Sequence, residues 1–107
     1  MRAYRLEHLS DTVLLRDLAA LVAQDRTITT ALLAHLAEVD AHRLYLPAGF
    51  PSMFTYCVDE LRMSDAEAYL RIQAARLGRQ YPLMVELFAN GSLHLTAIKL
   101  LMVAQYR

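Results

Sequence analysis

Apolar residues recur every three to four positions through the first 40 residues, the spacing of one face of an α-helix. A first stripe follows Ser10, a residue type that caps helix starts, and a second stripe follows with its phase shifted around residues 25–30. A short break and one bent helix both fit this shift. Because no Gly or Pro lies between residues 1 and 46, we favour nearly continuous helix over residues 11–43. The stripes consist of Leu14, Leu18, Leu21 and Val22, and then of Ile28, Leu32, Leu33, Leu36 and Val39.

Residues 46–52 form the clearest break, since Pro47 and Pro51 lack backbone donors and disfavour helix in the residue before each of them. Their apolar neighbours indicate a turn that packs on the core. Ser52 then begins a third predicted helix with Met53, Phe54, Cys57, Val58 and Leu61 on one face.

Residues 64–67 read Ser-Asp-Ala-Glu, the capping-box pattern of a helix start, so a fourth helix is predicted from there to about residues 80–81. Pro82 suits the first turn of a fifth helix, which we expect to end at Asn90 and Gly91. A sixth helix begins near residues 93–96 and meets no stop signal before Arg107. The chain is therefore expected to be an N-terminal fragment or a truncated form of a larger protein.

No period-two alternation competes with these helices. The predicted fold is all-α: one domain over residues 1–107, a compact bundle of five to six helices with a helix-turn-helix-like second half from Ser52 onward. The sixth helix offers an apolar face for a partner helix or a second copy of the chain. That face consists of Leu95, Ile98, Leu101 and Met102.

The composition of the 107 residues, 56% of them hydrophobic, excludes disorder and gives one small core. No stretch is long and apolar enough for a membrane span or a signal peptide, so we expect no membrane association. A single cysteine, Cys57, rules out an internal disulfide and a multi-cysteine zinc site, and it fits a cytoplasmic location.

Candidate catalytic chemistry is sparse. His35, Glu38 and His42 share one helix flank, but the two histidines are two turns apart, about 10 Å, too far to hold one ion unaided. Cys57 falls on an apolar helix face, where a thiol is usually inert. No phosphate loop, nucleophile elbow or dinucleotide fingerprint occurs. We therefore expect no catalytic residue, no metal and no cofactor.

Charge differs between segments although 11 basic residues balance 11 acidic ones. Residues 1–60 carry a net charge of −3, residues 61–81 carry +2 and residues 82–107 carry +1. Arg71, Arg76 and Arg79 fall within about 140° of one face of the fourth helix, and Gln73 lies on the same helix. A solvated arginine face is the commoner explanation; weak, salt-sensitive contact with DNA is the functional alternative.

Several stretches together resemble the N-terminal helical region of bacterial HNH endonuclease-family proteins. The most specific are LYLPAG at residues 44–49 and RIQAAR at residues 71–76, and the resemblance extends over about residues 10–101. The His-Asn-His nuclease module of that family lies far downstream, and no Asn-His or Asp-His pair occurs here. No catalytic residue of the family can therefore be placed on this chain.

The resemblance implies a non-catalytic accessory domain that aids DNA engagement or nuclease positioning. Arg71, Gln73, Arg76 and Arg79 would make any nucleic-acid contact. The alternative, from a different class, is a helical protein-interaction or homo-oligomerisation module. A free-standing enzyme is the least favoured reading, because no convergent polar set supports a mechanism.

Overall fold

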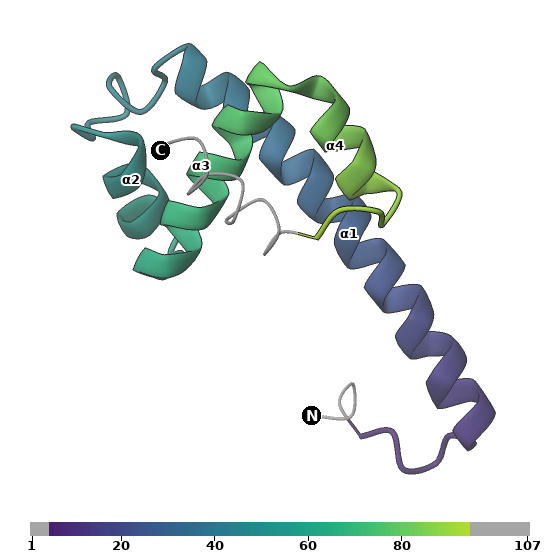
Figure 1. The fold of residues 1–107 in the computed structure, drawn as a ribbon. Coiled ribbons are helices and arrows are strands. Elements are labelled where there is room, and N and C mark those ends of the chain that lie inside the picture. The colour runs from purple at the N-terminus through teal and green to yellow at the C-terminus, as the bar shows by residue number, and fades with distance from the viewer. Residues whose placement is uncertain (1–4, 95–107) are drawn as a thin grey trace.

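The computed structural model describes residues 5–94, and its regular structure is entirely helical over that range (Figure 1). The elements are α1 (Asp11–Ala41), α2 (Met53–Thr55), a π-helical turn η2 (Tyr56–Glu60), α3 (Asp65–Gln80) and α4 (Pro82–Ala89). The all-α prediction is confirmed. Four α-helices are described, so the count of five to six is not confirmed, and the predicted sixth helix lies outside the described residues.

α1 is one continuous helix across the predicted phase shift. It begins where Ser10 accepts a hydrogen bond from the Val13 amide at 3.3 Å. The β-branched residues in its middle are accommodated because Thr27 and Thr30 donate their hydroxyls to carbonyls four residues earlier, at 3.1 and 2.8 Å. The continuous alternative for residues 11–43 is thus confirmed to within two residues.

The chain turns after α1, at the break that Pro47 and Pro51 predict. Gly49 has a φ of 98°, which glycine adopts without strain, and Arg43 enters the turn with a φ of 52°. Phe50 packs edge to face on Tyr56 with ring centroids 5.4 Å apart, so the turn is tied to the helices that follow it.

The predicted third helix is only partly α-helical. Ser52 and Thr55 form a capping box that starts α2. The chain then widens into η2, and the amides of Leu61 and Met63 reach back to the carbonyls of Tyr56 and Cys57. Of the predicted apolar face, Met53 and Cys57 are buried and Val58 packs against the core, whereas Phe54 and Leu61 are exposed.

α3 and α4 follow the sequence signals closely. Ser64 accepts from the Glu67 amide at 3.1 Å while Glu67 accepts from the Ser64 amide at 3.2 Å, the capping box in full. Pro82 opens α4, and Gly91, with a φ of 86°, follows its end. The turn of residues 61–64 has a length typical of a helix-turn-helix, whereas α3 and α4 are joined by Tyr81 alone.

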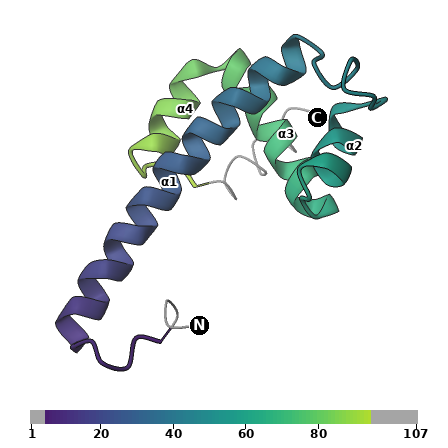
Figure 2. The same ribbon diagram turned by 180° about the vertical axis from the view of Figure 1, so that it is seen from behind.

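The core lies between the C-terminal half of α1 and the elements that fold back on it (Figure 2). Helix α3 supplies five of its eleven members, α1 supplies three, and α2, η2 and α4 supply one each. One aromatic residue expected on an apolar face, Phe54, is instead exposed at 38%. The buried cluster consists of Leu33, Leu36, Ala37, Met53, Cys57, Ala68, Ile72, Ala74, Ala75, Leu77 and Phe88.

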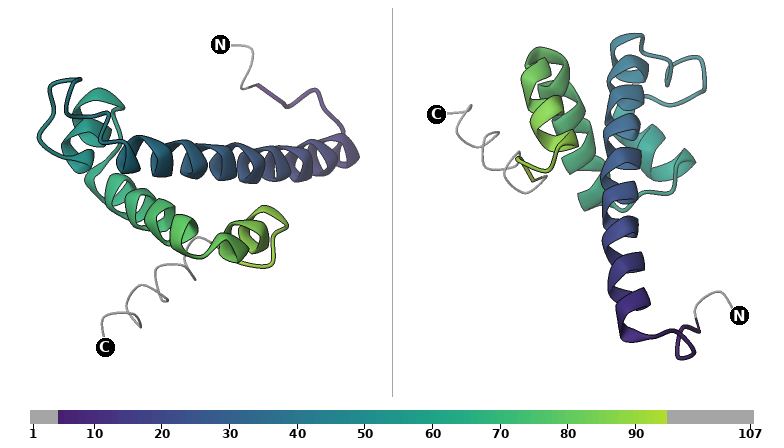
Figure 3. Two further views of the ribbon diagram at one scale, coloured as in Figure 1. Left: turned by 90° about the horizontal axis from the view of Figure 1, so that it is seen from above. Right: turned by 90° about the vertical axis from the view of Figure 1, so that its right-hand side faces the viewer.

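The N-terminal half of α1 extends beyond this core, and the expected compactness is wrong for it (Figure 3). At 1.5 Å per residue α1 is about 46 Å long and α3 only about 24 Å, so α3 cannot cover the whole helix. The first buried residue of α1 is Thr29. The radius of gyration is 16.7 Å, against about 13 Å for a compact domain of this length.

Candidate functional site

Each arginine of the predicted nucleic-acid face is paired with a carboxylate. Arg76 donates from Nε and Nη2 to the two carboxylate oxygens of Asp40, at 2.8 and 3.0 Å. Arg79 donates to Glu38 at 2.8 Å, and Arg71 pairs with Glu67 one turn earlier on α3 at 3.1 Å. Two of the three pairs therefore connect α3 to α1.

The two interhelical pairs differ in solvent exposure. The Asp40 side chain is 17% exposed and the Glu38 side chain is 63% exposed. The side chains of their arginine partners, Arg76 and Arg79, are about equally exposed, at 50% and 51%. A bidentate pair on a largely buried carboxylate contributes more to stability than an exposed single contact. The Arg76–Asp40 pair thus fixes α3 on α1, and the Arg79–Glu38 pair adds little.

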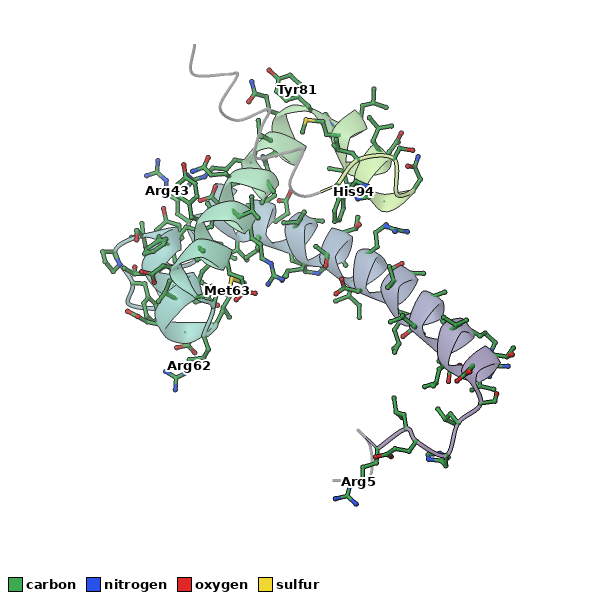
Figure 4. The ribbon with its side chains drawn as sticks, turned by 60° about the horizontal axis from the view of Figure 1, so that its bottom comes forward. Arg5, Arg43, Arg62, Met63, Tyr81 and His94 are labelled. Atoms are coloured by element: carbon green, nitrogen blue, oxygen red, sulfur yellow. The ribbon has the colours of Figure 1, made fainter. Side chains whose placement is uncertain are left out.

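These pairs lower the positive potential that a phosphate backbone would meet on α3. Gln73, the fourth residue of the predicted face, is half-buried. Arg43 and Arg62 carry no ion pair to another described residue, and both point away from the bundle in separate turns (Figure 4). The described part of the chain therefore gathers no unpaired basic cluster on one face.

The candidate chemical groups are held in structural roles. Burial raises the pKa of the fully buried Cys57 thiol, and the nearby Asp40 carboxylate raises it further, so the thiol stays protonated and unreactive. His35 Nδ1 lies 2.7 Å from the Ala31 carbonyl, and His42 lies 3.1 Å from Glu38. Among residues 5–94, no three His, Cys, Asp or Glu side chains gather as metal ligands.

Two recesses flank the C-terminal half of α1. The first, about 190 Å³, is mainly apolar and lies between α1, α3 and α4, with Leu33 and Phe88 in its lining. The second, about 240 Å³, is more polar and lies where α1 leaves the bundle; Asp25, Arg26 and His94 line it. Neither recess brings together groups for a reaction.

The most unusual surface is the exposed N-terminal segment of α1, residues 11–28, which we call the α1 arm. Five large aliphatic side chains on it are half or more exposed. They are Leu15 at 70%, Leu18 at 59%, Leu21 at 59%, Val22 at 50% and Ile28 at 66%. Scattered single apolar residues are normal on a surface, but five within 14 residues of one helix are uncommon.

The row continues the stripe that the bundle buries further along the same helix. Leu15 and Val22 are seven residues apart, and the buried residues Thr29 and Leu36 follow at the same interval. Residues seven apart lie within about 20° of one another on a helix. One face of α1 is therefore covered by α3 and α4 in its second half and uncovered in its first.

The sequence placed the partner surface elsewhere. Leu95, Ile98, Leu101 and Met102, the predicted partner-binding residues, lie outside the described residues. The arm's leucines were identified as a helix face but were expected to lie in the core. The two interhelical ion pairs were also missed, although the acidic excess of residues 1–60 and the basic excess of α3 were the available signal.

A scan against protein-family models, a search of curated proteins and a search of solved structures each found no match to this chain. None of the described helices is both long and apolar enough to span a membrane.

Proposed function

We propose that this chain is a non-catalytic helical interaction module whose docking surface is the α1 arm. The observation that supports it is the group of five exposed aliphatic side chains on the arm, of which Leu15, Leu18 and Val22 lie on the face that the bundle buries from Thr29 onward. A partner helix on the arm would continue the packing that α3 and α4 already provide.

The arm has an energetic reason to bind. An isolated helix of 18 residues is marginally stable in water, because most helix stability in proteins comes from packing an apolar face. Burying a fully exposed Leu or Ile side chain contributes about 1.5–3 kcal/mol. With exposures between 50% and 70%, each of the five arm side chains offers about 1–2 kcal/mol to a partner.

The absence of catalysis is part of the proposal. Within residues 5–94 the candidate nucleophile, Cys57, is buried, and the carboxylates of Glu38 and Asp40 bind arginines. The resemblance to the front part of HNH nucleases fits this role, because an accessory domain positions a nuclease by docking.

DNA engagement is a second candidate, and the ion pairs weigh against it. It predicts binding to duplex DNA that falls steeply as salt rises. The suitable variant is Arg71→Gln with Arg79→Gln, which preserves the Arg76–Asp40 pair and so the fold. Fluorescence anisotropy at low and physiological salt would detect the contact; no binding at low salt excludes it.

The docking proposal is tested by photo-crosslinking in the cells that make the protein. A photoreactive amino acid replaces Leu18 on the apolar row or, as matched control, Ala20, which lies about 200° around the same helix. We expect covalent adducts to a protein from position 18 and few from position 20. Equal labelling from both positions, or none from either, would contradict the proposal.

A further inference from the structure

We infer that the occupant of the α1 arm is the α1 arm of a second copy of this chain, packed antiparallel. This inference rests on the proposed function and names its partner. Three features support a second copy as the partner: the spacing of the exposed apolar residues, the charges among them and the position of the bundle.

The spacing along the arm is that of a coiled-coil seam. Leu14, Leu18, Leu21, Asp25 and Ile28 follow one another at intervals of four, three, four and three residues. This 3.5-residue period keeps one seam facing a partner helix along its length. Leu15 and Val22 border the seam on one side and widen the apolar surface.

The charges select the antiparallel arrangement. In a parallel pair each seam position meets its own copy, so Asp25 would face Asp25 and Asp11 would face Asp11. In an antiparallel pair with Leu18 opposite Leu21, these acidic residues separate.

The antiparallel register also provides a complementary contact. Asp25 then lies opposite Leu14 near the end of the paired segment, where its carboxylate stays in water. Asp11 falls within one turn of Arg26 of the other copy, whose guanidinium lies beside Gly91, where α1 leaves the bundle.

The fold leaves room for this arrangement. The bundle covers α1 only from Thr29 onward, so antiparallel arms place the two bundles at opposite ends of the dimer (Figure 1). Each arm is about 27 Å long, and its N-terminal end would reach the polar recess beside Arg26 on the other copy. Parallel arms would instead bring both bundles to the same end.

The buried area is enough for a dimer of moderate strength. An exposed aliphatic side chain presents about 100 Å² of apolar area, so the five arm residues offer about 300 Å² per copy. About 60% of a typical interface is apolar, so two copies that each bury about 300 Å² of apolar area would bury about 1,000 Å² of surface in total. This is at the lower limit of specific interfaces, which indicates association in the micromolar range.

Sedimentation velocity over a concentration series tests association. We expect a monomer that becomes a dimer in the micromolar range, loss of the dimer in Leu18→Glu and its retention in Ala20→Glu. Circular dichroism confirms that both variants keep the bundle, which neither substitution touches. A monomer up to about 200 μM would overturn the inference.

Disulfide formation tests the orientation. Leu14→Cys and Asp25→Cys chains are mixed under oxidised glutathione, with wild type as control because Cys57 is buried. Antiparallel arms give the mixed disulfide; a Leu14→Cys homodimer in its place would show a parallel pair and refute the inference. Photo-crosslinks from position 18 to a different protein, with no self-association, would refute the second copy and leave the docking proposal intact.

Discussion

Replacing Arg76 with Gln should destabilise the fold much more than the same change at Arg79. Both arginines lie on α3, both are about half exposed, and both reach an acidic residue on α1. They differ in the partner that the substitution leaves behind. Asp40 is 17% exposed and would lose two charge-assisted hydrogen bonds, whereas Glu38, 63% exposed, would keep its contact with His42 and gain water.

The expected magnitudes follow from that difference. Hydrogen bonds to charged groups contribute about 1.5–3 kcal/mol, and the half-exposed arginine reduces this, so Arg76→Gln should cost about 1–2 kcal/mol. Exposed pairs contribute about 0–1 kcal/mol, so Arg79→Gln should cost no more than about 0.5 kcal/mol. For a domain of this size the first change lowers the melting temperature by several degrees and the second by little.

Urea denaturation followed by circular dichroism measures both costs. Asp40→Asn and the double variant complete a double-mutant cycle, which isolates the coupling between Arg76 and Asp40. We expect coupling of about 1 kcal/mol or more. Equal losses from Arg76→Gln and Arg79→Gln, or no coupling in the cycle, would refute the reasoning from partner burial.

Three further predictions concern the helix start, the helix contact and the thiol. Ser64→Ala removes the cap that pairs with Glu67 and should cost about 1 kcal/mol in urea denaturation; a neutral result would show that α3 does not depend on its cap. Gly78→Ala gains about 1 kcal/mol of helix propensity, but the new methyl would lie 2.9 Å from Val85 Cγ2, so we expect a net loss that Val85→Ala relieves. Burial raises the pKa of Cys57 in the folded state, so as pH rises the thiol ionises first in the unfolded chain. The protonated thiol therefore contributes its whole stabilisation of the fold below the ordinary cysteine pKa. This contribution is lost as pH rises from there through the raised pKa. Unfolding free energies measured across alkaline pH should fall more steeply for wild type than for Cys57→Ala.

Local signals in the sequence predicted most element boundaries. The capping pattern at Ser64, the proline at the start of α4 and Gly91 after its end each act through the backbone of a few neighbouring residues, so they can be read without the fold. The π turn at residues 56–60 could not be predicted in this way, because its extra residue per turn depends on packing against α3.

The exposed α1 arm was harder to predict for a physical reason. The apolar stripe of α1 is similar in both halves, so periodicity alone does not tell which half is covered. Arg76 and Arg79 of α3 bind acidic residues near the C-terminal end of α1. α4 packs on the same half of α1, beside Leu33. Which half is covered depends on these long-range contacts, so the arm could not be identified from the periodicity of α1.

Hydrogen exchange across a concentration series tests the central claim, that the α1 arm is a docking surface filled by a second copy. An uncovered arm opens readily, and pairing should protect it. We expect the amides of residues 14–28 to exchange more slowly as the protein concentration is raised from about 1 to about 200 μM. The amides of residues 29–40 should keep the same protection at every concentration. Exchange in the arm that is the same at both concentrations would contradict the account.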